Sequence, residues 1–147
     1  MSKKISVING SNLNMLGRRE KNIYGNLSLD DINKRITDKF HGRAEIIFFQ
    51  SNHEGSVIDY IHSLPQTGVK CIVINAAAWT HTSIAIRDAL LSISLPFIEV
   101  HISNVYRREE FRKLSFLSDC AEGVITGLGI QGYEFAVQYF IDKMEAK

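Results

Sequence analysis

The sequence predicts an α/β fold in which a parallel sheet of five strands is covered by helices on both faces. Short apolar runs alternate with segments of helical periodicity along the 147 residues, a length that suits one domain. The third apolar run is apolar almost throughout, as expected for a strand that is buried on both sides. Such alternation is typical of parallel sheets with crossover helices. Right-handed crossovers and five strands favour the doubly wound, flavodoxin-like strand order 2-1-3-4-5.

The expected strands are five short segments rich in Ile, Val and Phe. They are residues 5–9, 45–50, 69–75, 97–102 and 124–126.

Helices are expected where apolar residues recur three and four positions apart, which gives a helix one buried face. Ser28 is followed three residues later by Asp31, a pair that can satisfy two free backbone N–H groups at a helix start. The expected first residues are Ser28 for the first helix, Ser51 or Asn52 for the second, Thr80 or Thr82 for the third and Tyr133 for the closing helix, which should reach Met144.

The composition excludes several classes of protein. Lys and Arg number 17 against 16 Asp and Glu, so no strong field favours nucleic acid or an anionic membrane. The apolar run at residues 5–8 is too short for a signal peptide, and no segment is long enough to span a bilayer. Cys71 lies in an apolar strand and is expected to be a buried, reduced thiol. We expect a single cytoplasmic domain over residues 1–147.

The connection over residues 10–25 has no regular period and is long for a compact domain. Within it, residues 17–25 are expected to form a lid in which Arg18 and Arg19 shortly precede Tyr24. A phenol has an ordinary pKa of about 10, and a nearby cation favours the phenolate and lowers that pKa. Tyr24 is therefore a candidate base beside Arg19. The alternative is a solvated loop whose tyrosine only packs.

Polar side chains gather where three of the expected strands end. In the order 2-1-3-4-5, ligands bind beyond the carboxyl ends of the strands, at the switch point between the first and third. Asn9 and Asn75 end these two strands, with Asn12 and His81 shortly beyond, and His101 stands near the end of the fourth. The sequence therefore places a binding crevice at this edge.

Glu99, His101 and Ser103 alternate with apolar residues and should point to one side of the fourth strand. A carboxylate beside an imidazole can orient it and raise its pKa, which makes His101 a candidate general acid with Glu99 as its support. The alternative is a core histidine bonded to its neighbours. Ser103, nearby backbone amides and Asn75 could hold a carboxylate, or simply cap turns.

Two patterns suggest a ligand site at first sight but lack the spacing that such a site requires. Residues 127–132 match G-x-G-x-x-G, but a dinucleotide site needs a further strand and an acidic residue about 20 positions on, so we expect close strand–helix packing. His81, His101 and Asp88 match no metal spacing, and no metal or cofactor is expected.

Other charged residues are expected on the surface, and two alternative functions are open. Arg107, Arg108 and Arg112 form a charged run expected to be a solvated face, and Asp88 is expected on the surface of the third helix. A non-catalytic module that binds a small carboxylic acid is the alternative to an enzyme, but it leaves the pairing of Arg19 with Tyr24 unexplained. A flavin or nucleotide binder would need a phosphate loop after the first strand.

At nearly full length the chain resembles the type II 3-dehydroquinate dehydratases. The segments that carry the resemblance are 9–14, 16–20 with 24–25, 50–55, 80–83, 98–104, 108–112 and 127–133. The resemblance implies a flavodoxin-like subunit in a dodecamer of four trimers. It implies anti elimination of water from 3-dehydroquinate, through an enolate, to 3-dehydroshikimate in the shikimate pathway. It implies no metal and no cofactor.

The resemblance also implies roles for individual residues. Tyr24 would take the proton from the carbon beside the ketone, Arg19 would keep Tyr24 ionised, and His101 would protonate the departing hydroxyl. The implied binding residues are Asn12 for a water near the enolate oxygen, Asn75, Ile102 and Ser103 for the carboxylate, His81 and Arg112 for the other hydroxyls, and Asp88 for a neighbouring subunit's site. The chain departs from the family pattern at Ser11, Lys21 and residues 76–79.

Overall fold

The computed structural model describes residues 2–18, 22 and 25–146, which form a five-stranded, all-parallel sheet of order β2-β1-β3-β4-β5. The strands are β1 (Lys4–Asn9), β2 (Glu45–Gln50), β3 (Cys71–Asn75), β4 (Phe97–His101) and β5 (Gly123–Thr126). The predicted fold class and strand order are confirmed. β3 begins two residues later and β4 ends one residue earlier than expected.

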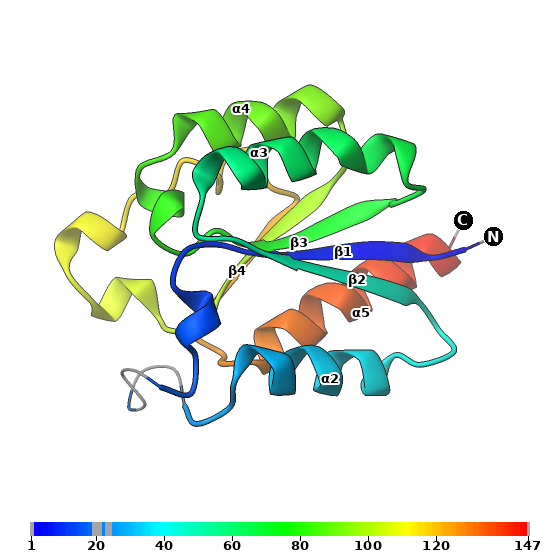
Figure 1. Ribbon diagram of the computed structural model, residues 1–147, viewed down its shortest axis with the longest axis horizontal. Helices are drawn as coiled ribbons and strands as arrows, with labels where there is room; N and C mark the ends of the chain where they lie inside the picture. Colours follow the sequence, from blue (N-terminus) through cyan, green and yellow to red (C-terminus); the bar gives the residue numbers. More distant parts are fainter. Residues whose placement is uncertain (1, 19–21, 23–24, 147) are drawn as a thin grey trace.

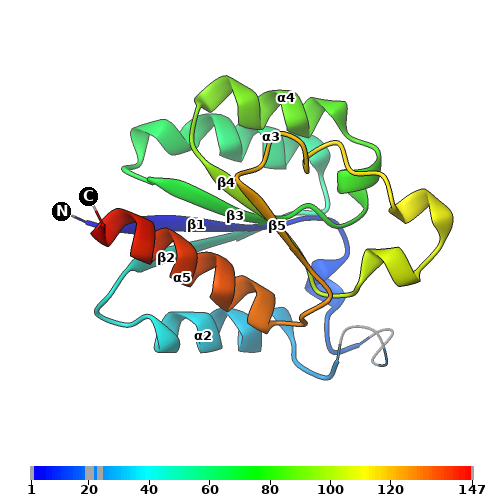
Figure 2. The same ribbon diagram turned by 180° about the vertical axis from the view of Figure 1, so that it is seen from behind.

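Helices cover both faces of the sheet (Figures 1 and 2). The helices are α2 (Leu29–Lys39) and α5 (Gln131–Glu145) on one face, and α3 (Glu54–Ser63) and α4 (Ile84–Ile93) on the other. Each pair closes its own apolar cluster against the sheet. Neighbouring strand residues point to opposite faces, so Val7 enters the cluster under α2 and α5 while Ile8 enters the one under α3 and α4.

The first helix begins as predicted. The Ser28 hydroxyl accepts a hydrogen bond from the Asp31 N–H, and the Asp31 carboxylate accepts one from the Ser28 N–H, both at 3.1 Å. This reciprocal pair satisfies two N–H groups that have no partner inside the helix. Ile32 and Ile36, one turn apart, are buried against the sheet.

The predicted start of α3 is wrong. His53 is the N-cap residue, and its side chain makes no capping hydrogen bond. The Asn52 side-chain oxygen instead accepts hydrogen bonds from the Asn12 N–H at 2.8 Å and from the Gln50 side chain at 3.2 Å. Asn52 therefore ties the loop after β1 to the loop after β2.

The predicted start of α4 is also wrong. Ser83 caps this helix by accepting from the Ile86 N–H at 2.9 Å. Thr80 lies earlier, in the short helix η3 (Ala77–His81), where it is buried and donates to Glu99 at 3.3 Å. The Thr80 hydroxyl, which local preference would use to cap the helix, is instead engaged in a tertiary hydrogen bond with Glu99.

Within residues 127–132, Gly132 shows the close strand–helix packing that was expected. A Cβ on Gly132 would lie 3.3 Å from Ile125 and 3.4 Å from Val100, so α5 approaches β4 and β5 closely there. Cys71 and Cys120 are free thiols, and burial raises the pKa of Cys71 to about 12, which makes it unreactive. Within the described ranges, no helix is both long and apolar enough to cross a membrane.

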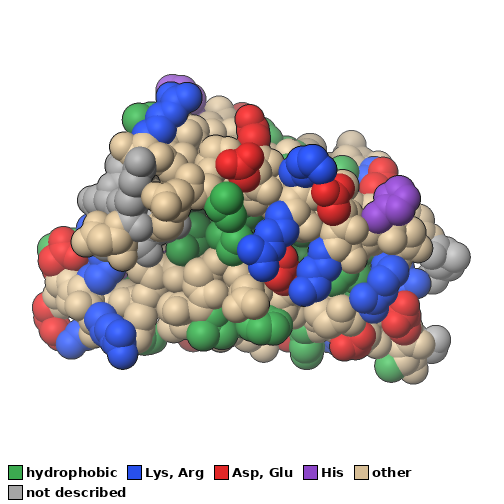
Figure 3. All heavy atoms as spheres, turned by 90° about the horizontal axis from the view of Figure 1, so that it is seen from below, with side chains coloured by type: hydrophobic (Ala, Val, Ile, Leu, Met, Phe, Trp, Pro, Cys, Tyr) green, Lys and Arg blue, Asp and Glu red, His purple; other side chains and the backbone are tan. Residues whose placement is uncertain are grey.

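The outer surface of α2 and α5 carries interspersed basic and acidic side chains (Figure 3). Beneath this surface, Glu134 of α5 is buried, with only 3% of its side chain exposed. Arg35 binds it at 2.8 Å and Lys39 at 3.4 Å, and both cations come from α2. This ion pairing links α2 to α5 across the surface.

The carboxyl ends of β1 and β3 are in close contact at Gly10. The Gly10 N–H donates to the Asn75 carbonyl at 2.8 Å, and the Gly10 carbonyl accepts from Gln50 at 3.1 Å. A Cβ on Gly10 would lie 2.4 Å from the Ala76 carbonyl oxygen, a distance that requires the backbone to move.

We therefore expect Gly10→Ala to lower the free energy of unfolding by about 1–3 kcal/mol, because overpacked sites cost that much. Gly55→Ala is the matched control, since Gly55 lies inside α3 with nothing within 4 Å of an added Cβ. It should stabilise the protein by roughly 0.5–1 kcal/mol through helix propensity. Urea unfolding measures both changes, and equal effects of the two substitutions would contradict the close contact at Gly10.

Candidate active site

A pocket of about 110 Å³ opens beyond the carboxyl ends of β1, β3 and β4. The loop after β1, including η1 (Leu13–Met15), contributes Ser11, Asn12, Leu13 and Leu16. The end of β3 and η3 contribute Asn75, Ala77, Ala78 and His81. The end of β4 and the segment holding η4 (Val105–Arg107) and η5 (Glu110–Arg112) contribute His101, Ile102, Ser103, Val105, Arg108 and Arg112.

The pocket brings together most of the residues that the sequence singled out. Those that line it are Asn12, Asn75, His81, His101, Ile102, Ser103 and Arg112. Asp88 is exposed on α4 and does not line it. Arg19 and Tyr24 lie outside the described residues.

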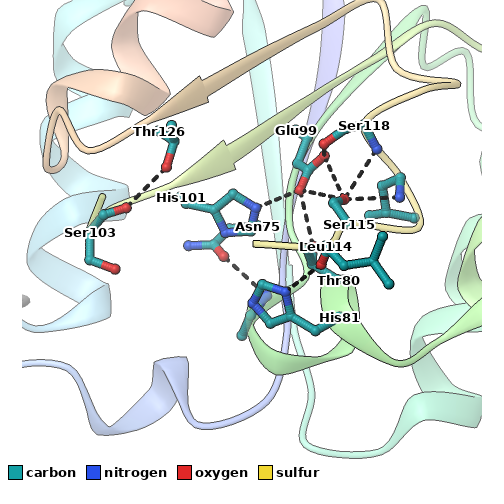
Figure 4. Close-up of polar contacts among 12 residues, drawn as sticks. Asn75, Thr80, His81, Glu99, His101, Ser103, Leu114, Ser115, Ser118 and Thr126 are labelled. Atoms are coloured by element: carbon teal, nitrogen blue, oxygen red, sulfur yellow. Dashed lines mark hydrogen bonds and ion pairs between the residues drawn. The ribbon is translucent and has the colours of Figure 1, made fainter. Parts of the chain in front are cut away.

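His101 and Glu99 form a buried pair at the end of β4 (Figure 4). His101 Nε2 lies 2.5 Å from the Glu99 carboxylate, and the two side chains are 7% and 1% exposed. An ionised carboxylate can only accept, so Nε2–H is the donor. This contact leaves Nδ1 as the ring nitrogen that can exchange a proton with a ligand.

Hydroxyl groups complete the surroundings of Glu99. Ser118 donates at 2.6 Å, Ser115 at 3.0 and 3.1 Å, and Thr80 at 3.3 Å. Burial acts to raise the pKa of Glu99, but the hydrogen bonds from His101 and the two serines together outweigh it, and the pKa lies below its usual value. Glu99 is therefore a carboxylate at neutral pH.

His81 faces the same pocket as a neutral imidazole. Its Nδ1–H donates to the Leu114 carbonyl at 2.7 Å, which leaves Nε2 as an acceptor. Burial lowers the pKa of His81, and electrostatic interactions with His101 and Arg112 lower it further, whereas the Leu114 hydrogen bond and Glu99 act to raise it. The His81 and His101 rings are nearly parallel, with centroids 6.3 Å apart.

A chain of buried hydrogen bonds fixes the Asn75 amide. Its NH₂ group donates to the Tyr133 hydroxyl at 2.9 Å, and that hydroxyl donates to the Asn9 side-chain oxygen at 2.6 Å. The Asn75 oxygen accepts from the Ala77 N–H at 3.1 Å. Sequence reasoning missed Tyr133, whose only signal was its position on the apolar side of the closing helix.

The expectation of a solvated arginine run is wrong for two of its members. The Arg108 and Arg112 side chains are only 15% and 23% exposed, and both line the pocket. Arg108 donates to the Ser103 hydroxyl at 3.3 Å, and Arg112 donates to Glu109 at 2.9 Å. The short turns η4 and η5 fold the run back over the strand ends, which the charge pattern alone did not reveal.

The site combines cations with a carboxylate–imidazole pair and polar amides. Such a pocket can bind a small anion and move a proton on it. Across residues 2–18, 22 and 25–146, no group of three or more His, Cys, Asp or Glu side chains could hold a metal ion. Fold and site together define a flavodoxin-like enzyme of the acid–base type that acts on a small anionic molecule.

Comparison with known proteins identifies the family. The chain belongs to the Dehydroquinase class II family, whose sequence profile matches residues 3–141. A 3-dehydroquinate dehydratase of Acinetobacter baumannii is 54% identical over 99% of this chain and 97% of its own length. Another, of Histophilus somni, is 58% identical over 92% of this chain and 91% of its own.

Solved structures agree with this assignment. The crystal structure of a type II dehydroquinase from Butyrivibrio crossotus superposes with a TM-score of 0.92 at 48% identity, and the match covers 95% of this chain and 97% of that one. A 3-dehydroquinate dehydratase-like protein from Bifidobacterium longum gives a TM-score of 0.70 at 26% identity, over 97% of this chain and 98% of that one.

Tyr133→Phe tests the buried chain behind Asn75. Removing the hydroxyl leaves the Asn9 oxygen without its donor and the Asn75 amide without its acceptor, so the free energy of unfolding should fall by about 1–3 kcal/mol. Tyr139→Phe, at a position of the same helix that is 45% exposed, should change it by less than about 0.5 kcal/mol. Thermal or urea unfolding distinguishes the two, and an equally small effect at Tyr133 would show that the chain is not needed for stability.

Proposed function

We propose that this protein is a 3-dehydroquinate dehydratase, a hydro-lyase that removes water from 3-dehydroquinate to give 3-dehydroshikimate in the shikimate pathway. The names of relatives that match almost the whole chain support this reaction. The observation that carries the proposal is the His101–Glu99 pair in a pocket edged by Arg108 and Arg112. This arrangement supports the reaction because an imidazole held by a carboxylate can donate a proton and the cations suit a carboxylate substrate.

The elimination needs a base for the carbon acid and an acid for the leaving hydroxyl. We assign the base to Tyr24, whose phenolate would take the proton from the carbon beside the ketone. Arg19 would hold Tyr24 ionised, because a cation beside a phenol lowers its pKa. Loss of the proton gives an enolate, and Asn12 would hold a water at the enolate oxygen. Departure of the hydroxyl from the opposite face makes the elimination anti.

The acid is assigned to His101. In its cationic form, Nε2–H stays bonded to Glu99 while Nδ1–H faces the ligand, so the proton on Nδ1 passes to the departing hydroxyl and water leaves. The Glu99 carboxylate lies 2.5 Å from Nε2 and stabilises the imidazolium before transfer. After the step, His101 is neutral and Tyr24 carries the substrate proton, so solvent exchange must reset both groups.

The remaining pocket residues would bind and orient the substrate. Asn75, Ser103 and the Ile102 N–H are assigned to its carboxylate, and Arg108 adds a cation next to Ser103. His81 Nε2, as a bare acceptor, would take a hydrogen bond from a substrate hydroxyl, and Arg112 would donate to another. The proposed chemistry uses no metal and no cofactor. We take residues 1–147 as one catalytic domain that acts in the cytoplasm.

Tyr24→Phe tests the assignment of the base. Formation of the enone product is followed by ultraviolet absorption after 3-dehydroquinate is added. The parent should turn over, whereas the variant should lose a factor of about 10² to 10⁴ or more in kcat, as is typical when a general base is removed. Substrate binding, measured by calorimetry, should persist.

Tyr139→Phe, on the outer face of α5, is the control and should keep parental activity. If Tyr24→Phe turns over within a few-fold of the parent, the assignment of Tyr24 as the base is wrong. If the parent itself does not turn over 3-dehydroquinate, the proposed reaction is wrong.

We also propose that the protein assembles as a dodecamer, a tetramer of trimers, in which Asp88 completes a neighbouring subunit's site. The outer face of α4 supports a subunit contact there. Asp88 is exposed between Ile84 and Leu91, which are 56% and 51% exposed and lie one turn away on either side. An apolar stripe around an acid suits burial against a second copy of the chain.

Mixing two variants tests the role of Asp88. Asp88→Asn should lose about tenfold or more in kcat/KM if its carboxylate makes a charge-assisted contact with the neighbour's site. When dissociated Asp88→Asn and Tyr24→Phe chains are reassembled together, some sites combine an intact Tyr24 with an intact Asp88, so activity should rise above that of either variant alone. Sedimentation should give about twelve times 16.6 kDa for each sample. No recovery in correctly assembled mixtures would contradict the role in a neighbouring site.

A further inference from the structure

The segment 114–118 provides the hydrogen-bond partner of His81 and contacts Glu99, the partner of His101 (Figure 4). Its first residue provides the carbonyl that accepts the Nδ1–H of His81 at 2.7 Å. Ser115 and Ser118 donate to the Glu99 carboxylate, which in turn accepts the Nε2–H of His101. One stretch of chain, far from β4 in sequence, therefore holds the groups that orient both imidazoles.

Ser115 acts towards Glu99 as a donor. Its hydroxyl oxygen accepts from the N–H groups of Leu117 at 3.0 Å and Ser118 at 3.1 Å. A hydroxyl has two lone pairs and one hydrogen. With both lone pairs engaged by backbone amides, the hydrogen is directed at the carboxylate.

Every hydrogen-bond partner that Glu99 has among the described residues can serve it as a donor. Oε1 accepts from Ser115 and Ser118, and Oε2 accepts from His101, Ser115 and Thr80. If Glu99 were protonated, its own hydrogen would need an acceptor. The Ser115 oxygen cannot accept it, because both of its lone pairs already accept backbone N–H groups. The set of donors therefore favours the ionised form of a carboxylate that is only 1% exposed.

We propose that Ser115 and Ser118 are positioning residues of the dehydratase reaction, which keep Glu99 ionised and aimed at His101 Nε2. This inference rests on the proposed role of His101 as the acid. If the serine donors are lost, the shared proton of the Glu99–His101 pair is held more tightly, partly on Glu99. The imidazolium is then stabilised, and its separate Nδ1 proton is a weaker acid towards the departing hydroxyl.

The segment is anchored by contacts that do not involve the two hydroxyls. The Phe116 N–H donates to the Thr80 carbonyl at 2.8 Å, and the Phe116 carbonyl accepts from Arg87 at 2.9 Å. Arg87 also pairs with Asp119. These bonds to η3 and α4 should keep the segment in place when a serine hydroxyl is removed.

Other titratable and charged groups face the pair and stay unchanged in serine variants. They are His81 from η3, Tyr106 from η4, Arg112 and Lys113 at the end of η5, and Cys120 after Ser118, with Arg108 on the ligand side of the pocket. β5 contributes Val124 and Thr126, which carry no charge. A change in the titration of the pair in these variants can then be assigned to the lost donors.

The test uses Ser118→Ala and the double variant Ser115→Ala/Ser118→Ala, with Ser118→Thr as the conservative replacement. Ser63→Ala is the matched control, because the Ser63 hydroxyl donates to the Tyr60 carbonyl at the far end of α3. The His101 titration is followed by ¹⁵N NMR of histidine-labelled protein and assigned by its loss in His101→Asn. Removing donors from a carboxylate raises the proton affinity of the pair. The apparent pKa of the pair should therefore rise by about one unit for each hydroxyl removed.

Turnover should change in step with this titration. Because the acid must be protonated to act, the basic limb of the kcat profile should move to higher pH by the same amount. kcat at neutral pH should fall about tenfold in the double variant, with KM within about twofold of the parent, since proton transfer rather than binding is affected. Ser118→Thr keeps a hydroxyl at this position and should therefore show the parental titration, unlike Ser118→Ala. Ser63→Ala should match the parent in every measurement.

The NMR titration of His101 and the pH profile of kcat together show which of the two assignments is wrong, that of the serines or that of His101. A His101 titration that does not move in Ser118→Ala or in the double variant overturns the positioning role of the serines, as does a failure of Ser118→Thr to restore it. A titration that moves while the basic limb of the rate stays in place supports the hold of the serines on Glu99 and overturns the assignment of His101 as the acid.

Discussion

The pairing of β1 with β3 is the constraint on which the site depends. Their register places Asn9 beside Asn75, and the next peptide, at Gly10, donates back to the Asn75 carbonyl. A residue without a Cβ is needed at that point because the Ala76 carbonyl occupies the space. The chain then diverges on both sides of the contact, and the pocket forms between the diverging loops.

Two buried carboxylates, Glu134 and Glu99, have their negative charges compensated in different ways. Glu134 is neutralised by the cations Arg35 and Lys39, so its charge serves to hold α2 against α5. Glu99 is surrounded by hydroxyls and one imidazole; the hydroxyls solvate its charge, and that charge can stabilise His101 when the imidazole is protonated. A buried charge held in this way can still act on His101, whereas a salt-bridged one would act chiefly on its own partners.

Tertiary contacts also explain why two helix starts differ from local preference. Asn52 and Thr80 are good capping residues by type, but the first bridges two loops at the rim of the site and the second donates to Glu99. Ser28 accepts from the Asp31 N–H and caps α2 as expected. At these two positions a tertiary hydrogen bond replaces the local cap, whereas Ser28 follows the local rule.

The sequence by itself determined the alternation of strands and helices, the strand order, and the edge of the sheet at which polar groups collect. These features follow from local hydrophobic periodicity and from the fixed handedness of crossovers, which a linear pattern records. It also singled out His101, Glu99 and Asn75, because side chains at the ends of parallel strands must meet.

The tertiary structure alone decided which distant groups complete the site. Tyr133 reaches Asn75 across 58 positions of sequence, Ser118 reaches Glu99 across 19, and Arg108 turns into a pocket that its charged run did not suggest. The orientation of each group depends on hydrogen bonds made after the chain has folded. Such contacts leave no periodicity in the sequence, so no pattern in it could have specified them.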